Sequence, residues 1–456
     1  MENITEIKGL SILIIGMARS GIAAAEVLGD AGANVTITDI KQREQLGEVP
    51  AALAARGVRV VAGEYPDVSR DNTDLVIISP GVPLTISPAQ AALREGISLW
   101  SELELAFRLA PAPFLAVTGT NGKTTTTALL GQVLRDAGCQ VVVGGNIGVP
   151  LIGEVGGLTS EHLVVAEVSS FQLERIEKFR PLVSIILNLT PDHIDRHGTF
   201  EGYVRAKARI LENQGSGDYA ILNWDDEGVR RLAGGTGAKV VYFSQKQELE
   251  EGVWLRDSEV VVRWRGVERT VCDWGDIYLK GAHNLENAMA ATAAATVLGV
   301  DCQSIRNTLN TFRGVAHRLE FVDRIGEVDY INDSKGTNPD AAIKALDSFD
   351  RPIVLIAGGK DKGSDFAEFA RKAREKAKAV VLVGQAAPKI RQAMEESGVG
   401  NIHQVQTFPD AVRQAGRLAG PGDVVLLSPA CASWDMFNNF EERGDLFKGL
   451  VLAMRG

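Results

Sequence analysis

One short segment restricts the possible folds of this chain more than any other. The apolar run Phe114-Leu115-Ala116-Val117 leads into a loop, Gly119-Thr120-Asn121-Gly122-Lys123-Thr124, and residues with helical character follow it. A buried strand, a glycine loop and a helix in this order are typical of a parallel α/β domain that binds phosphate, because the unpaired N–H groups at the helix start attract an anion. Lys123 is then predicted to reach the terminal phosphates of a nucleotide, and Thr124 to hold Mg²⁺ through its hydroxyl group.

The loop departs at one position from the usual G-x-x-x-x-G-K-[ST] pattern. That pattern would place glycine where this chain has Val117, so Gly119 serves in a shortened variant. The alternative is a tight glycine turn without a ligand. The coincidence of strand, Gly-Lys-Thr and helix argues against that alternative.

The alternation of apolar runs and helical segments extends over 456 residues, which is more than a single hydrophobic core usually organises. Strands are predicted at 11–15, 35–38, 75–78, 114–117, 163–166, 184–187, 353–357, 380–383 and 424–427. Residues 239–278 alternate apolar and polar side chains, which predicts smaller antiparallel strands. We therefore predict an α/β protein with a Rossmann-like domain at 1–110, a P-loop domain at 111–314 and a second Rossmann-like domain at 315–456.

Composition argues against several other classes of protein. The net charge of −10 disfavours binding along a nucleic-acid backbone. The four cysteines form no C-x-x-C pair, so neither a zinc site nor a disulfide framework is indicated. The N-terminus lacks a basic region followed by an apolar one, and no run of about 18 apolar residues occurs. We expect a cytoplasmic enzyme that does not insert into a membrane.

Polar residues that follow the predicted strands are candidates for chemistry. Glu167 is a candidate Mg²⁺ ligand, because a hard cation prefers carboxylate oxygen, although a solvated glutamate is the alternative. His193 follows a strand of the same domain, and its alternative is a structural or exposed loop histidine. Asp39 lies beyond the turn 16–21, which superficially resembles a dinucleotide fingerprint. Ala18 replaces the middle glycine of that fingerprint, which disfavours NAD but leaves another nucleotide possible.

Several longer strings together resemble the Mur ligase family of peptidoglycan synthesis, and the resemblance spans the whole chain. They are Thr118-Gly-Thr-Asn-Gly-Lys-Thr124, Gly144-Gly-Asn-Ile-Gly148, Glu167-Val-Ser-Ser-Phe-Gln-Leu-Glu174, Asp192-His-Ile-Asp-Arg196, Gly281-Ala-His-Asn-Leu-Glu-Asn287 and Ala316-His-Arg318. The strings that resemble the D-glutamate-adding branch are Asn332-Asp-Ser-Lys-Gly-Thr-Asn338 and Ser428-Pro-Ala-Cys-Ala-Ser-Trp-Asp-Met-Phe437.

The resemblance implies that the first domain binds a uridine nucleotide, the central domain ATP and the third domain the incoming amino acid. The residues implied for the UDP substrate are Ser20, Asp39, Ile40, Lys41, Ser79 and Asn146, with Asn146 and His193 nearer its reacting end. Those implied for ATP are Gly119, Thr120, Asn121, Gly122, Lys123, Thr124, Thr125, Asn284, Asn287, Arg318 and Asp333. Those implied for D-glutamate are Thr337, Lys362, Ser433 and Phe440, with Lys335 near the reacting phosphate.

Lys207 resembles the family's carbamylated lysine. Carbamylation turns an ammonium into an anionic group with two oxygens, which can coordinate a second Mg²⁺. Without the resemblance, the sequence pattern around Lys207 favours a solvent-exposed lysine on a helix. The catalytic residues implied by the resemblance are Lys123, Glu167, His193 and Lys207, and the implied ligands of two Mg²⁺ ions are Thr124, Glu167, His193 and Lys207.

The resemblance implies a monomeric ATP-dependent ligase that joins D-glutamate to UDP-N-acetylmuramoyl-L-alanine through an acyl phosphate. Ligases that add L-alanine or a diamino acid, and folylpolyglutamate-type ligases, are the alternatives, but the Asp-Asn-Pro-Arg motif of the diamino-acid enzymes is absent. A nicotinamide-dependent oxidoreductase is disfavoured by Ala18. A nucleotide-binding regulator is disfavoured by the intact set Lys123, Glu167, His193 and Lys207.

Overall fold

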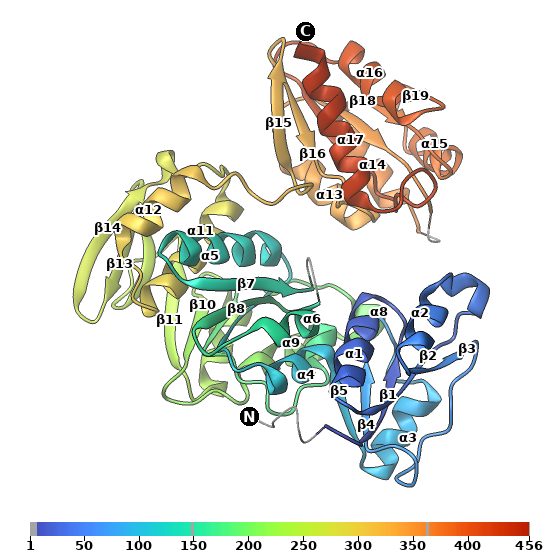
Figure 1. Ribbon diagram of the computed structural model, residues 1–456. Coiled ribbons are helices and arrows are strands. Elements are labelled where there is room, and N and C mark those ends of the chain that lie inside the picture. The colour runs from blue at the N-terminus through green and yellow to red at the C-terminus, as the bar shows by residue number, and fades with distance from the viewer. Residues whose placement is uncertain (1–6, 147–149, 362–363, 456) are drawn as a thin grey trace. The chain divides into compact units, whose positions relative to one another are not determined.

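The computed structural model describes residues 7–146, 150–361 and 364–455 (Figure 1). Two compact units make up the chain: Met1–Phe312 contains two sheets and Arg313–Gly456 contains one. Each of these sheets is mostly parallel and accompanied by helices, which confirms the predicted α/β class. The domain boundaries at 110 and 314 stay predictions.

The first sheet, blue in Figure 1, has five parallel strands in the order β3-β2-β1-β4-β5. Its elements are β1 (Ser11–Ile15), α1 (Arg19–Asp30), β2 (Asn34–Asp39), α2 (Val49–Ala55), β3 (Arg59–Ala62), β4 (Leu75–Ile78), α3 (Ser87–Glu95), β5 (Ser98–Ser101) and α4 (Glu102–Leu109). The predicted strands at 11–15, 35–38 and 75–78 are confirmed. Strands β3 and β5 are not predicted from the sequence, because each is only four residues long and includes polar residues.

The central sheet has nine strands in the order β14-β13-β12-β11-β10-β9-β6-β8-β7. Its strands are β6 (Phe114–Thr118), β7 (Gln140–Gly145), β8 (His162–Glu167), β9 (Val183–Ile186), β10 (Tyr219–Asn223), β11 (Lys239–Ser244), β12 (Gly252–Arg256), β13 (Glu259–Trp264) and β14 (Val267–Asp273). Its helices are α5 (Lys123–Asp136), α6 (Leu151–Glu154), α7 (Ser170–Leu173), α8 (Ile194–His197), α9 (Phe200–Ala208), α10 (Glu227–Arg231), α11 (Ala282–Val297) and α12 (Cys302–Thr311).

The antiparallel strands predicted within 239–278 are confirmed for β12, β13 and β14. The prediction is wrong for β11, which pairs in parallel with both β10 and β12. Helix α10 connects β10 to β11, and such a crossover brings the next strand back in the parallel direction.

The second unit contains a six-stranded sheet in the order β15-β16-β20-β17-β18-β19. Strands β15 and β16 are antiparallel, and the other pairs are parallel. Its elements are β15 (Glu320–Ile325), β16 (Val328–Asn332), α13 (Pro339–Asp347), β17 (Ile353–Ala357), α14 (Ala367–Lys376), β18 (Ala377–Leu382), α15 (Ala387–Glu396), β19 (Ile402–Gln404), α16 (Phe408–Leu418), β20 (Val424–Leu427) and α17 (Phe440–Leu452). Two apolar clusters contain alternate residues of its strands, as expected for a sheet buried on both faces.

The first two sheets form one unit because they share a hydrophobic core. One apolar cluster contains Ile14 and Ile77 of the first sheet together with Phe114 and Ala166 of the central sheet. A second cluster fills the other face of the central sheet, beneath helices α5 and α11, which pack against each other (Figure 1). Continuous burial of this kind favours unfolding of the two sheets together.

The buried carboxylate of Glu104 also joins the two sheets. It belongs to α4 and accepts hydrogen bonds from the backbone N–H groups of Glu177, Lys178 and Phe179 at 3.0, 2.9 and 2.9 Å. Arg108 Nε donates to the same carboxylate at 2.6 Å. The side chain of Glu104 is 0% exposed, so these donors replace its hydration.

We expect Glu104→Gln to lower the free energy of unfolding of the first unit by about 3–5 kcal/mol, as when one partner of a buried ion pair is removed. The amide turns one acceptor into a donor that faces N–H groups. Denaturant titration followed by circular dichroism measures the effect. Glu177→Gln is the matched control, because Glu177 pairs with the same Arg108 but its side chain is 45% exposed. The control substitution is expected to lower the free energy of unfolding by about 1 kcal/mol or less. Equal effects of the two variants would contradict the prediction.

Candidate functional site

The glycine loop joins β6 to α5 and has a backbone that requires glycine at two positions. Gly119 and Gly122 have φ values of +146° and +83°. A Cβ on Gly119 would lie 3.0 Å from Leu187 Cβ, and one on Gly122 would lie 2.2 Å from Asn287 Oδ1. Helix α5 begins at Lys123 without a side-chain cap. Its first N–H groups are therefore not capped by a side chain, which suits the anion that the sequence predicts at this helix start.

Residues that follow β9 hold this loop in place. Thr120 N donates to Asn188 O at 2.9 Å, and Asn121 N donates to Asn188 Oδ1 at 2.8 Å. The hydroxyl of Thr120 contacts the backbone of Thr190 and lies 3.1 Å from Tyr203 Oη. No role is predicted from the sequence for Asn188 or Tyr203. The position of Asn188 directly after a buried strand was the signal available for it.

Two lysines meet at one carbonyl group of the loop. Lys123 Nζ donates to Gly119 O and Thr120 O at 2.9 and 2.8 Å. Lys207 Nζ, from α9, donates to the same Gly119 O at 2.8 Å and to Thr118 Oγ1 at 3.4 Å. The predicted catalytic lysines therefore lie together, although they are far apart in the sequence.

Lys207 is buried, which the pattern of its helix does not indicate. It is only 2% exposed, and its Nζ lies 4.7 Å from the ring centre of Tyr203. Burial lowers the pKa of Lys207 well below its usual value, and the positive charge of Lys123 lowers it further. Burial raises the pKa of Tyr203 to about 12, so this hydroxyl stays protonated. The surroundings favour an uncharged amine at Lys207.

Glu167, at the end of β8, connects two other predicted residues. Its Oε2 accepts a hydrogen bond from Thr124 Oγ1 at 2.7 Å, and its Oε1 accepts one from Asn146 Nδ2 at 2.9 Å. Asn146 N also donates to Glu167 O at 2.9 Å. The carboxylate is thus fixed beside the first turn of α5, where its oxygens and the threonine hydroxyl form a donor set that suits Mg²⁺.

His193 caps the start of α8 in a left-handed conformation, with a φ of 52°. Its ring centre lies 4.9 Å from that of Phe171, and its Nε2 lies 3.7 Å from Asp192 Oδ2. The side chain is 49% exposed, so it is open to a ligand. Its role as a metal ligand stays a prediction.

Two asparagines of α11 lie beside the glycine loop. Asn287 Oδ1 accepts a hydrogen bond from Thr126 Oγ1 at 3.1 Å, and Asn287 Nδ2 donates to Asn284 Oδ1 at 3.3 Å. The structure thereby brings the predicted ATP residues of the first unit together, including the half-buried Thr125 in the first turn of α5.

Most residues predicted for the UDP substrate lie at or after the ends of strands of the first sheet, and Asn146 follows β7 of the central sheet. Asp39 Oδ2 accepts from Met17 N at 2.9 Å, and its Oδ1 accepts from Lys41 N at 3.0 Å. The hydroxyl of Ser79 donates to Gly16 O at 3.3 Å. The predicted residues next to these are Ser20 in the first turn of α1, with no side-chain cap at the helix start, and Ile40, which is 57% exposed.

The second unit carries the remaining residues predicted for ATP. Asp333 is fully buried and accepts hydrogen bonds from Ser428 Oγ at 2.8 Å and Leu319 N at 3.3 Å. Burial raises the pKa of Asp333 to about 6, which the positive charge of Arg318 opposes. Arg318 is half-buried, and its N donates to Val315 O at 3.1 Å. The two predicted residues therefore interact electrostatically, and their role in binding ATP stays a prediction.

The residues predicted for D-glutamate lie in segments that follow the strands of the same sheet. Thr337 lies in the turn after β16, where its N donates to Lys335 O at 2.8 Å. Ser433 is 2% exposed and lies beyond the end of β20, and Phe440 is the first residue of α17. Lys362 lies outside the described residues.

His317 is a buried residue of the second unit for which no separate role is predicted from the sequence. Its φ is 62°, and its Nδ1 lies 3.0 Å from Asn332 Nδ2. A Cβ on Gly444 would lie 2.1 Å from the same Nδ1, so α17 packs closely on the ring. Burial lowers the pKa of His317, which favours a neutral ring with a structural role.

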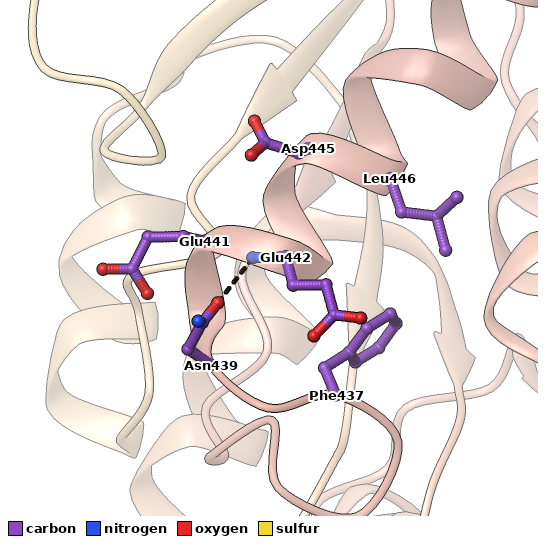
Figure 2. Close-up of a pocket in the computed structure, with 6 residues that line it drawn as sticks. All are labelled: Phe437, Asn439, Glu441, Glu442, Asp445 and Leu446. Atoms are coloured by element: carbon purple, nitrogen blue, oxygen red, sulfur yellow. Dashed lines mark hydrogen bonds between the residues drawn. The ribbon is translucent and has the colours of Figure 1, made fainter.

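A pocket of about 530 Å³ lies beside the start of α17, outside these predicted sites. Figure 2 shows Glu441 and Asp445 on one side of the helix and Phe437, Glu442 and Leu446 on the other. Asn439, which completes the lining, accepts a hydrogen bond from Glu442 N at 2.7 Å. Its acidic side chains disfavour an anionic amino acid, so we do not assign D-glutamate to this pocket.

Two general features limit the kinds of site in the described part of the chain. No helix there is long and apolar enough to cross a membrane. The same residues contain no cluster of three or more His, Cys, Asp or Glu side chains arranged to hold a metal ion by themselves. A Mg²⁺ ion at Glu167 would therefore need further oxygen ligands, such as the hydroxyl of Thr124 and phosphate oxygens.

Comparison with known families and proteins agrees with this geometry. Three family models match the chain: a Mur ligase MurD-like N-terminal domain at 10–101, a Mur ligase middle domain at 117–295 and a Mur ligase glutamate ligase domain at 317–431. The UDP-N-acetylmuramoylalanine–D-glutamate ligase of Pelotomaculum thermopropionicum is 53% identical over 97% of this chain and 98% of its own length. The ligase of the same name from Alkaliphilus oremlandii is 46% identical over 98% of this chain and 99% of its own length.

Solved structures support the fold. The UDP-N-acetylmuramate-alanine ligase of Thermotoga maritima has a TM-score of 0.58 at 22% identity and covers 98% of this chain and 100% of its own. MurF from Acinetobacter baumannii has a TM-score of 0.58 at 18% identity and covers 91% of this chain and 90% of its own. From the family models, the full-length relatives and the glycine loop, we conclude that the chain belongs to the Mur ligase family.

Proposed function

We propose that this chain joins D-glutamate to the free carboxyl group of UDP-N-acetylmuramoyl-L-alanine, with ATP as the phosphoryl donor. The observation that carries the proposal is the 53% identity, over nearly the full length of both chains, to a ligase named for this reaction. The converging residues of the first unit support the same chemistry. A carboxylate resists attack by an amine at neutral pH, so it must first be activated, and transfer of the γ-phosphoryl group to it gives an acyl phosphate.

Lys123 and the start of α5 would stabilise the charge that develops on the transferred phosphoryl group. The backbone N–H groups of the loop are fixed by the contacts of Thr120 and Asn121 with Asn188, so they need little rearrangement during the reaction. Electrostatic stabilisation by groups already in place is the main source of catalysis in phosphoryl transfer. The amine of D-glutamate then attacks the acyl phosphate, and phosphate leaves.

Thr124 and Glu167 fit a Mg²⁺ site, because their oxygens lie 2.7 Å apart at the phosphate loop. The ion, when bound, supplies positive charge to the phosphate oxygens. Asn146 keeps the carboxylate in place by its hydrogen bond to Glu167 Oε1. We also propose that His193 would be a further ligand of the ion, since its side chain is half exposed.

We further propose that Lys207 is carbamylated and serves a second Mg²⁺. Two ammonium groups on the one carbonyl of Gly119 would repel each other, and burial already favours an uncharged Lys207. An uncharged amine can attack the carbon of CO₂: a C–N bond forms, one proton is released, and an anionic carbamate results. The new charge has the opposite sign to that of Lys123, so it removes the repulsion.

The remaining assignments follow the three-domain division at 1–110, 111–314 and 315–456, which we retain as a proposal. The residues after the first sheet would bind the uridine nucleotide, and those around Asp333 and Ser433 would bind ribose and D-glutamate respectively. We propose that the enzyme acts as a monomer in the cytoplasm, where ATP is available.

Phosphate release from ATP tests the function directly. With UDP-N-acetylmuramoyl-L-alanine present, we expect release with D-glutamate but not with L-lysine, meso-diaminopimelate or L-alanine. A matched reaction without the UDP substrate controls for simple ATP hydrolysis. Release that depends on a diamino acid in place of D-glutamate would overturn the proposal.

A further inference from the structure

Arg443, in the first turns of α17, is one of the largest fully buried side chains of the described residues. Its Nε donates to Ser334 Oγ at 2.9 Å, and its Nη2 donates to Ser334 O at 2.8 Å. Both Nη atoms also lie 3.3 Å from Cys431 O. One guanidinium therefore joins the turn after β16 to the turn after β20.

Ser334 extends the connection to a third segment. Its hydroxyl donates to Phe440 O at 2.8 Å, so the start of α17 is attached to the same pair of residues, Arg443 and Ser334. The turn after β17 also lies close to the guanidinium of Arg443, because a Cβ on Gly359 would be 3.2 Å from Arg443 Nη1. Arg443 thus lies beneath several loops that meet at one end of the third sheet.

These loops carry the described residues that we propose for D-glutamate. Thr337 lies in the turn after β16, Ser433 lies in the turn after β20, and Phe440 begins α17. Their relative positions depend on how the three segments are held together. A shift of about 1 Å in such a site is enough to weaken catalysis strongly.

A buried cation whose hydrogen bonds go to neutral oxygens is costly, and the nearby carboxylates of Asp435 and Asp333 offset only part of that cost, so its presence needs a reason. The side chain is 1% exposed, and its hydrogen bonds in the described structure go to two carbonyl groups and a hydroxyl. Burial lowers the pKa of Arg443 to about 10, so it is still charged at neutral pH. An apolar side chain would fill the volume without losing hydration, but it has no fork of N–H donors to hold two backbone segments at once.

We propose that Arg443 is a positioning residue for the amino-acid site: it fixes the three segments that present Thr337, Ser433 and Phe440. This inference rests on the proposed function. It predicts that loss of the fork weakens binding of D-glutamate more than binding of the UDP substrate, whose proposed residues lie in the other unit.

The test compares KM for each substrate in the full-length enzyme with Arg443→Lys, which keeps the charge but loses the fork. We expect KM for D-glutamate to rise about tenfold, as for the loss of one or two hydrogen bonds, while KM for the UDP substrate changes less than about twofold. Ser334→Ala is the second variant: it removes the hydroxyl between Arg443 and Phe440, and we expect a smaller rise of about threefold. Arg455→Lys is the control, because this arginine of the same unit is 65% exposed and pairs with Asp323.

The outcomes separate the inference from the proposed function. A wild-type enzyme that releases no phosphate with D-glutamate overturns the proposed function and this inference with it. An active wild type whose KM for D-glutamate is unchanged in Arg443→Lys, or whose KM values all rise equally, overturns the inference alone. Should Arg443→Lys not fold, the same criteria apply to Ser334→Ala.

Discussion

Replacing Lys207 with alanine is expected to lower the rate of phosphate release about 1000-fold, the size of effect seen when a preorganised charged group is removed from an active site. The variant removes the amine that we propose to carry the carbamate. Added formate or acetate should restore part of the activity, because a small carboxylate can occupy the space and supply the missing oxygens. Steady-state assays with and without these anions measure both effects.

Arg205→Ala is the matched control for Lys207→Ala. Arg205 lies on the same helix, α9, but is exposed, so its loss should leave activity within about twofold. A ¹³C label from bicarbonate should give a carbamate signal in the wild type that is absent in Lys207→Ala. Near-normal activity of Lys207→Ala would rule out an essential role, and failure of every carboxylate to restore activity would count against the carbamate.

Replacing Lys123 with methionine is expected to lower kcat/KM for ATP by about 1000-fold or more, because the variant removes the charge that we propose to face the transferred phosphoryl group. Methionine has a similar length, so the volume is retained while the ammonium is lost. The hydrogen bonds of the Lys123 ammonium to Gly119 O and Thr120 O are lost as well. Phosphate release at saturating concentrations of the other substrates measures the loss.

Arg135→Met is the control for Lys123→Met, since Arg135 is an exposed cation in the last turn of the same helix, α5. We expect its activity to stay within about twofold of the wild type. Unlike Lys207→Ala, Lys123→Met should not recover with formate or acetate, because it lacks a cation and not a carboxylate. Recovery of both variants by the same anions would contradict the distinct roles proposed for the two lysines.

Much of the site could be predicted from the sequence because its signals are local. The glycines of the loop, the lysine after them and the polar residues at strand ends all depend on a backbone that a few neighbouring residues determine. Glu167 is such a case: it is the last residue of a buried strand, and it lies where a residue at that edge of a parallel sheet must lie. The long strings of the Mur ligase family made the resemblance specific as well.

Other parts depended on contacts between distant segments. The sequence around Lys207 is typical of an exposed helix face, but packing against β6 and the loop buries it and lowers its pKa. The roles of Arg443 and Glu104 also depend on distant partners, because Ser334 lies 109 residues from Arg443 and Glu177 lies 73 residues from Glu104. Short strands such as β3 and β5 are also decided by their neighbours in the sheet.

The sequence by itself therefore determined the α/β class, the phosphate loop at Gly119 and the family, since strand, turn and helix signals act over a few residues. Only the tertiary structure decided that Lys207 meets Lys123 at one carbonyl, and that one arginine joins the loops of the proposed amino-acid site. The physical reason is that burial and charge pairing are properties of the space around a side chain, and that space is formed by segments far apart in the chain.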